Sequence, residues 1–278
     1  MLQLFHNVSE NCSRIVAEKY SSSFYSAIRL LHKDLRAPIC NIYGFVRFTD
    51  EIVDTFHEHD KELLLQQFKK ATYEAIERKI SLNPILNSFQ LTVNEYKIEY
   101  GQIEAFFRSM EFDLSKKTYS KEEYNEYIYG SAEVVGLMCL QVFSRGDKKI
   151  YQQLEDHARA LGAAFQKVNF LRDLKADNRD LCRMYFPGCD FNNFMEKDKR
   201  EIEKDIQHDF RQAYEGILKL PVQSRFGVYV AYKYYLSLFE KIKKTAPCHI
   251  LQKRIRIPDY RKLMIVAGAG LKHQLKLL

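Results

Sequence analysis

Two pairs of aspartates lie in stretches of sequence that otherwise look like core helices. Asp50 and Asp54 are four residues apart, and so are Asp173 and Asp177. Residues at this spacing share one face of an α-helix. Two buried carboxylates repel each other and are costly to remove from water, so such pairs favour a divalent cation between them.

Other polar residues extend both aspartate pairs along their helix faces. Tyr43 and Arg47 continue the first face, and Glu51 adds a neighbouring acid; Gln166 and Asn169 continue the second. Oxygen ligands of this kind suit Mg²⁺, which commonly binds through one or two carboxylates and the phosphates of a substrate. A single aspartate pair on a helix usually faces solvent, but two pairs on apolar helices predict one shared Mg²⁺–diphosphate site.

The elements that position these residues are predicted to be helices. Only 11 Gly and 6 Pro interrupt 278 residues, and no stretch shows the alternation of a strand. We therefore expect a single all-α domain over residues 1–278, with eight to ten helices. The stretches with a helical pattern, from which this rough number is taken, are 9–20, 24–31, Pro38 through 41–54, 60–80, 84–100, 101–114, 121–145, 150–180, 196–219, 222–244 and 259–277.

Composition and charge narrow the classes of protein and partner. The six cysteines form no C-x-x-C pair, and no apolar run approaches the roughly 20 residues that span a bilayer. The N-terminus has no basic region followed by an apolar core, so we expect a cytoplasmic protein with reduced thiols. Residues 241–278 hold ten Lys and Arg against Asp259 alone. No nucleic-acid-binding module is present. The partner of this basic segment is therefore an anionic membrane or an anionic substrate, unless the segment is simply a solvated basic surface.

Four segments, in order, resemble the squalene/phytoene synthases, the head-to-head prenyl transferases, and most of all the bacterial phytoene synthases. They are YSSSFYSAIRLL, IYGFVRFTDEIVD, YIYGSAEVVGLM, and LGAAFQKVNFLRDLKAD with RMYFP, within about residues 20–265. The resemblance implies an all-α isoprenoid-synthase fold. Its helices surround a central cavity, and the two aspartate motifs face each other across the mouth.

The resemblance also implies roles for individual residues. The implied metal ligands are Asp50, Glu51, Asp54, Asn169, Asp173 and Asp177. The implied catalytic residues are Arg47, Asp50, Asp54, Tyr127, Asp173 and Asp177. The implied substrate-binding residues are Ser21, Ser23, Phe24, Tyr43, Arg47, Gln166, Asn169, Arg183, Tyr185 and Tyr235, and Lys262 matches a weaker C-terminal pattern. The departures from the family pattern are Glu51 for a usual Asp, Glu133 for Gly, Val168 for Thr and Cys182 for Gly.

The implied reaction joins two prenyl diphosphates through a cyclopropylcarbinyl diphosphate, with Mg²⁺ as cofactor and Mn²⁺ as a possible substitute. The short chain, with no C-terminal anchor and no Gly-rich dinucleotide fingerprint, favours the branch that uses no NADPH. We therefore expect phytoene from two geranylgeranyl diphosphates, in carotenoid biosynthesis. The alternatives are squalene or dehydrosqualene from two farnesyl diphosphates, or a non-catalytic prenyl-lipid-binding or assembly protein of the same fold.

The expected partners follow from this chemistry. They are the prenyl diphosphate substrates, the downstream carotenoid enzymes and an anionic membrane. We expect residues 241–278 to hold the protein peripherally on the inner face of that membrane, and we expect no nucleic acid.

Overall fold

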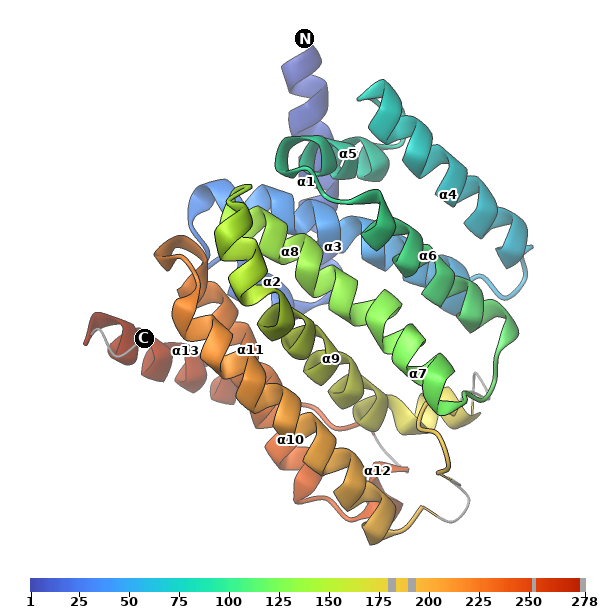
Figure 1. The fold of residues 1–278 in the computed structure, drawn as a ribbon, viewed down its shortest axis with the longest axis vertical. Helices are drawn as coiled ribbons and strands as arrows, with labels where there is room; N and C mark the ends of the chain where they lie inside the picture. The colour runs from blue at the N-terminus through green and yellow to red at the C-terminus, as the bar shows by residue number, and fades with distance from the viewer. Residues whose placement is uncertain (180–183, 190–193, 252–253, 276–278) are drawn as a thin grey trace.

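The protein folds into packed helices (Figure 1), as shown by a computed structural model. The structure describes residues 1–179, 184–189, 194–251 and 254–275, and within 175–179 it describes the backbone only. In these ranges there is no β-strand, and only an isolated bridge joins Thr118 to Met184. The predicted all-α fold is confirmed.

Thirteen α-helices and one π-helix lie in the described ranges, so the predicted number of eight to ten is too low. They are α1 (Leu2–Tyr20), α2 (Ser22–Ile28), α3 (Lys33–Asp54), α4 (Lys61–Arg78), α5 (Pro84–Tyr96), α6 (Tyr100–Ser115), α7 (Lys121–Ile128), η1 (Tyr129–Glu133), α8 (Val134–Ser144), α9 (Lys148–Arg179), α10 (Glu196–Lys219), α11 (Val222–Lys243), α12 (Pro247–Ile250) and α13 (Asp259–Gln274).

Several predicted boundaries were wrong for identifiable reasons. α1 begins at Leu2, well before the predicted start. α5 ends at Tyr96 because Lys97 adopts a left-handed conformation with φ 55° and closes the helix. α12 is a single turn, too short to show a periodic pattern.

The helix predicted over 121–145 is interrupted by the π-helix η1 at the point where it meets its neighbours most closely. A Cβ added at Gly130 would lie 2.3 Å from the carbonyl oxygen of Ala105 in α6. On the other side, a Cβ added at Gly162 of α9 would lie 2.4 Å from the carbonyl oxygen of Ala132. Single π-turns re-aim the side chains of a helix and are frequent at functional sites.

The stretch Lys121–Ser144 also corrects the expectation that no apolar run approaches the length needed to span a bilayer. Within the described residues it is long and apolar enough to cross a membrane, judged by length and composition. However, 56% of its most apolar window is buried inside the protein. The core helix of a globular protein has the same property.

The core side of α3 is fixed by a cluster of phenylalanines. Phe45 is fully buried, and its ring centroid lies 3.9 Å from that of Phe89 in α5. Phe106 and Phe107 of α6 pack around it at 5.3 and 5.5 Å. Such aromatic packing holds α3 in one rotation, so its polar face is turned away from this cluster.

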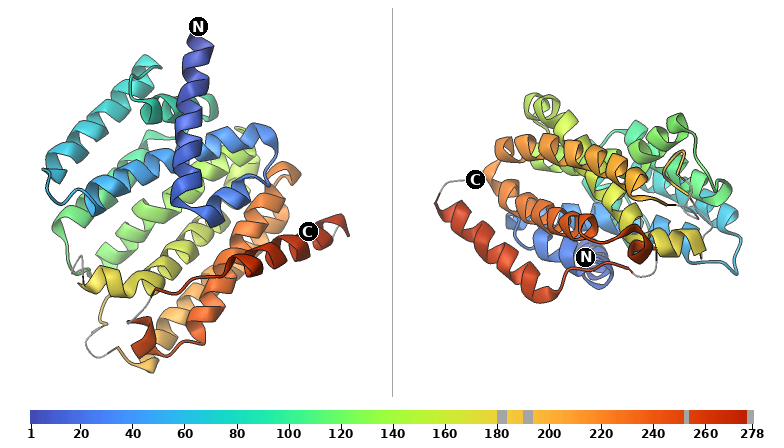
Figure 2. Two further views of the ribbon diagram at one scale, coloured as in Figure 1. Left: turned by 180° about the vertical axis from the view of Figure 1, so that it is seen from behind. Right: turned by 90° about the horizontal axis from the view of Figure 1, so that it is seen from below.

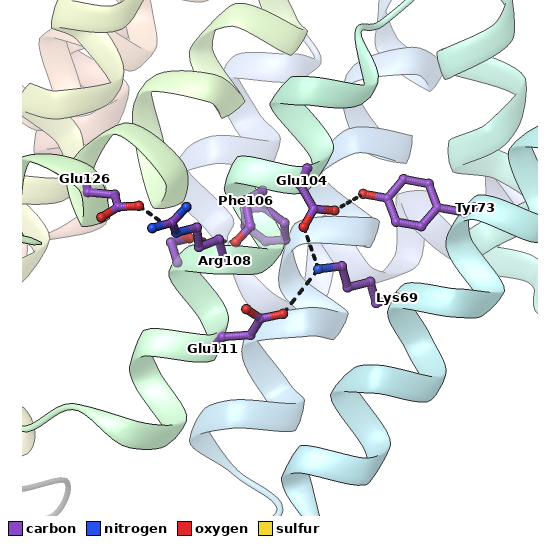
Figure 3. Close-up of polar contacts among 8 residues, drawn as sticks. Lys69, Tyr73, Glu104, Phe106, Arg108, Glu111 and Glu126 are labelled. Carbon is purple, nitrogen blue, oxygen red and sulfur yellow. Dashed lines mark hydrogen bonds and ion pairs between the residues drawn. The ribbon is translucent and has the colours of Figure 1, made fainter.

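The outer side of α6 is tied to its neighbours by polar contacts (Figure 3). Lys69 and Tyr73 of α4 both bond Glu104 of α6 at 2.7 Å, and Arg108 pairs with Glu126 of α7 at 2.6 Å. Exposed pairs like these add little stability individually. Their positions leave the opposite face of α6 turned toward the interior.

The close contact at Gly162 generates a stability prediction. The change Gly162→Ala forces α9 away from Ala132 and should lower the free energy of unfolding by about 1–3 kcal/mol, as overpacking does. The matched control is Gly101→Ala, because nothing lies within 4 Å of a Cβ at that helix position. The control should be neutral or stabilising by up to about 1 kcal/mol. Urea denaturation measures both, and equal effects would contradict the close packing.

Candidate active site

An apolar cavity of about 220 Å³ lies between α2, α3, α8, α9, α10 and α11. Ser131 and Gln166 are polar residues in its wall, while Phe143 and Leu154 also line it. Ser131 and Phe143 are twelve residues apart along the chain, and so are Gln166 and Leu154. At the rise of a helix this corresponds to a depth of about 18 Å. The cavity is therefore long, with Ser131 and Gln166 at its polar end and an end that is apolar apart from His157.

Both aspartate-bearing helices end on the same side of the molecule (Figures 1 and 2). Asp50 and Asp54 lie in the last turns of α3, and Asp173 and Asp177 lie in the last turns of α9. The side chain of Asp177, and the whole of Arg183, lie outside the described residues.

The polar face of α3 is a dense arrangement of charges. Arg47 forms an ion pair with Glu51, and its guanidinium lies over the Tyr20 ring, 4.5 Å from the centroid. Burial raises the pKa of Asp50 well above its usual range, and the neighbouring charge of Asp54 raises it further against the opposing effect of Arg47. A nearby cation would relieve this cost.

The polar face of α9 carries a second acid held by two arginines. Asp173 accepts from Arg172 at 3.0 Å and pairs with Arg254 at 2.7 Å. Gln166 lies 3.5 Å from the Ser131 hydroxyl in η1. The Asn169 side-chain oxygen is buried and has no hydrogen-bond partner among the described residues. This oxygen is available to a ligand.

Asp113 of α6, which the sequence analysis missed, joins the two faces. Tyr127 donates to one of its oxygens at 2.8 Å and Tyr185 donates to the other at 3.2 Å. The Tyr185 ring stacks on Phe170 of α9, with centroids 4.0 Å apart. The negative charge of Asp113 also raises the pKa of Asp50. Two predicted site residues therefore meet on one unpredicted carboxylate between α3 and α9.

The sequence does contain a signal for Asp113. Phe106, Met110 and Asp113 recur at i, i+4 and i+7, so an acid continues the apolar face of α6. Asp113 is only 8% exposed, as an acid on a core face would be.

Residues of α2 and α3 form one wall of the site. Ser21 caps α2 by accepting a hydrogen bond from the Phe24 amide at 3.2 Å, and Ser23 follows in the first helical turn. The Phe24 ring stacks on Tyr43, with centroids 5.2 Å apart. Burial raises the pKa of the Tyr43 hydroxyl, despite the opposing effect of Arg47.

The C-terminal third of the chain also contributes to the site. Tyr235 of α11 stacks on Phe165 of α9, with centroids 3.9 Å apart. Lys262 of α13 donates to the Ser22 hydroxyl at 3.0 Å, next to Ser21. Arg254, another residue missed from the sequence, was visible only as one charge of the basic 241–278 segment.

Two of the residues that depart from the family pattern, Glu133 and Val168, lie outside the cavity wall. Glu133 turns to Arg159 of α9, 2.7 Å away. Val168 is completely buried. Neither side chain is among the described residues that line the cavity, and Cys182 lies outside the described residues.

The donor set fits a divalent cation by its chemistry. Asp50, Asp54 and the side-chain oxygen of Asn169 are hard oxygen ligands of the kind that Mg²⁺ prefers. Within the described side chains, no three His, Cys, Asp or Glu residues form a group that could hold a metal ion. That search did not include the Asp177 side chain. The predicted metal set therefore stays a prediction.

Comparisons with known proteins agree with this geometry. The family model described as squalene/phytoene synthase matches residues 17–261. The chain belongs to the squalene/phytoene synthase family. It is therefore a prenyltransferase of a family that generally depends on divalent metal ions, and the predicted family is confirmed.

Two curated relatives illustrate the match. The chain is 28% identical to a phytoene synthase from Arthrospira platensis, with 95% of this chain and 92% of the relative covered. It is 27% identical to a 15-cis-phytoene synthase from Synechococcus elongatus, with the same coverage.

Solved structures of the same fold are also similar. A dehydrosqualene synthase in complex with a ligand superposes with a TM-score of 0.81 at 18% identity and covers 98% of both chains. A squalene synthase from Alicyclobacillus acidocaldarius gives a TM-score of 0.72 at 18% identity, covering 86% of this chain and 94% of that one. These likenesses confirm the predicted isoprenoid-synthase fold.

The bond between Tyr127 and Asp113 generates a second prediction. Tyr127→Phe removes a charge-assisted hydrogen bond in the interior and should lower the free energy of unfolding by about 1.5–3 kcal/mol. The matched control is Tyr234→Phe, which removes a long, neutral contact of 3.3 Å with Ser26. It should cost about 1 kcal/mol or less. Thermal denaturation compares them, and an equal loss would contradict the special role of Asp113.

Proposed function

We propose that this prenyltransferase is a magnesium-dependent phytoene synthase of carotenoid biosynthesis. It joins two geranylgeranyl diphosphates head to head through a cyclopropylcarbinyl diphosphate. The observation that carries the proposal is the long apolar cavity between α3 and α9, the two helices whose polar faces carry Asp50 and Asp173. The curated relatives named phytoene synthase support the choice of substrate.

The polar end binds the two diphosphate groups. Arg47 and Arg254 supply positive charge on the two sides of the site, and the buried Nε of Arg47 is a donor without a partner in the described structure. A bound Mg²⁺, for which Mn²⁺ can substitute, would neutralise the charge that develops on a leaving diphosphate. Asp50, Asp54, Asn169, Asp173 and Asp177 would hold it, together with Glu51 as a possible further ligand.

The apolar end protects the carbocations that form when diphosphate leaves. Its wall excludes water, which would convert a carbocation to an alcohol. The stacked pairs Phe24–Tyr43 and Phe165–Tyr235 present aromatic faces that stabilise positive charge. Two C20 diphosphates yield one C40 hydrocarbon, two diphosphates and two protons, so the proposed product requires no NADPH.

The setting of the reaction belongs to the same proposal. Residues 1–278 act as one domain, peripherally bound to the inner, cytoplasmic face of a membrane. The basic charge of residues 241–278 supports this placement. The apolar product passes there to downstream carotenoid enzymes.

Product identification tests the proposed function. Purified protein receives geranylgeranyl or farnesyl diphosphate with Mg²⁺, with and without NADPH, and extracted hydrocarbons are identified by mass spectrometry. We expect phytoene from geranylgeranyl diphosphate without NADPH. Squalene or dehydrosqualene from farnesyl diphosphate as the main product would establish the C30 alternative. No hydrocarbon from either substrate would favour the non-catalytic alternative.

The depth of the cavity generates a prediction about chain length. Cys139 of α8 lines the cavity between Ser131 of η1 and Phe143 of α8, so Cys139→Phe should obstruct the longer tail. We expect the C40 to C30 product ratio to fall at least about tenfold, equivalent to about 1.4 kcal/mol between competing barriers. Cys139→Ser, which nearly preserves volume, is the control. An unchanged ratio in a folded Cys139→Phe protein would show that this cavity does not hold the tail.

A further inference from the structure

The outer side of α13 carries apolar side chains that no described part of the protein covers. Tyr260, Met264 and Leu271, with Leu275 just after the helix, follow the spacing i, i+4, i+11 and i+15, and Leu263 lies beside them. These five side chains are between 61% and 72% exposed. The spacing places them on one face, so they form a continuous apolar stripe.

The opposite side of α13 is fastened to the protein. Ile265 and Val266 pack on the core and Ala269 is buried. The His273 ring stacks on Phe226 of α11, with centroids 5.0 Å apart. α13 lies on the outside of the molecule beside α11 (Figures 1 and 2). The stripe is thus held in an outward direction.

The charges around the stripe are almost all positive. The basic residues of α13 are Arg261, Lys262 and Lys272, and Asp259 is its only acid. Asp259 is already paired with Lys262 at 3.0 Å. A second copy of the chain in a two-fold interface would bring these same positive charges face to face. An anionic lipid surface complements both the charge and the apolar stripe.

We propose that α13 is an in-plane membrane anchor, whose stripe of Tyr260, Leu263, Met264, Leu271 and Leu275 inserts into an anionic bilayer surface. This names the surface behind the membrane association proposed above. The orientation of the cavity mouth toward the bilayer also rests on the proposed function. Lys262 at the start of α13 contacts Ser22 beside the mouth, so the anchor holds the mouth close to the bilayer that supplies prenyl chains.

Vesicle flotation tests the anchor without any substrate. Wild-type protein should float with vesicles of phosphatidylcholine and phosphatidylglycerol, and far less with phosphatidylcholine alone. The double variant Leu263→Gln and Leu271→Gln should reduce the floated fraction at least tenfold, because both side chains lie on the stripe. Leu82→Gln is the matched control: Leu82 is 93% exposed in the connection between α4 and α5, away from α13 (Figure 1).

A fluorescent reporter locates the inserted face. The chain contains no tryptophan, so Leu271→Trp gives a single signal whose emission should shift to the blue when the anionic vesicles are added. Leu82→Trp should show no shift. A catalytically impaired Asp50→Asn protein should float like wild type, which separates failure of the anchor from failure of the proposed reaction.

Two results would overturn the proposal. One is unchanged flotation of the Leu263→Gln and Leu271→Gln protein together with no blue shift at Leu271→Trp. The other is a concentration-dependent dimer of wild-type protein that this double variant abolishes, since the stripe would then be an interface between two copies.

Discussion

The arrangement of the whole site depends on carboxylates that are placed close together inside a helical protein. Asp50 is partly buried beside Asp54, and the charge of Asp113 reaches it from another helix. Each desolvated negative charge raises the cost of ionising the next. Such a group is tolerated where positive charge is supplied. In this protein the supply comes from Arg47, Arg172 and Arg254, and in the proposed reaction from Mg²⁺ as well.

The helices that carry these acids are held by packing on the side away from the site. Phe45 fixes α3 against α5 and α6, while contacts with α4 and α7 fix the outer face of α6. Glycines at 130 and 162 allow α6, η1 and α9 to approach backbone to backbone. Rigid elements place acidic groups more precisely than loops.

The sequence predicted the parts of this site that follow from periodicity within one helix. The aspartate pairs, their polar neighbours and the all-α class are local patterns. The apolar face of α6 marks Asp113 as an acid in a core position, but its approach to Asp50 depends on how α3 and α6 pack, which no local pattern shows. Arg254 was one of many positive charges until the fold brought it to Asp173. The π-helix and the left-handed end of α5 depend on contacts and single backbone angles, so helical periodicity did not reveal them.

The central claim is that the two aspartate helices serve one metal–diphosphate site. The direct measurement is calorimetric binding of a non-reactive geranylgeranyl thiodiphosphate, with and without Mg²⁺, to wild type and to the single variants Asp50→Asn and Asp173→Asn. We expect Mg²⁺-dependent binding that each variant alone weakens at least tenfold, with turnover lowered about 10²–10⁴-fold, or about 3–5 kcal/mol of barrier. Asp156→Asn, an exposed acid elsewhere on α9, should behave like wild type. Wild-type binding by either site variant would contradict a single shared site.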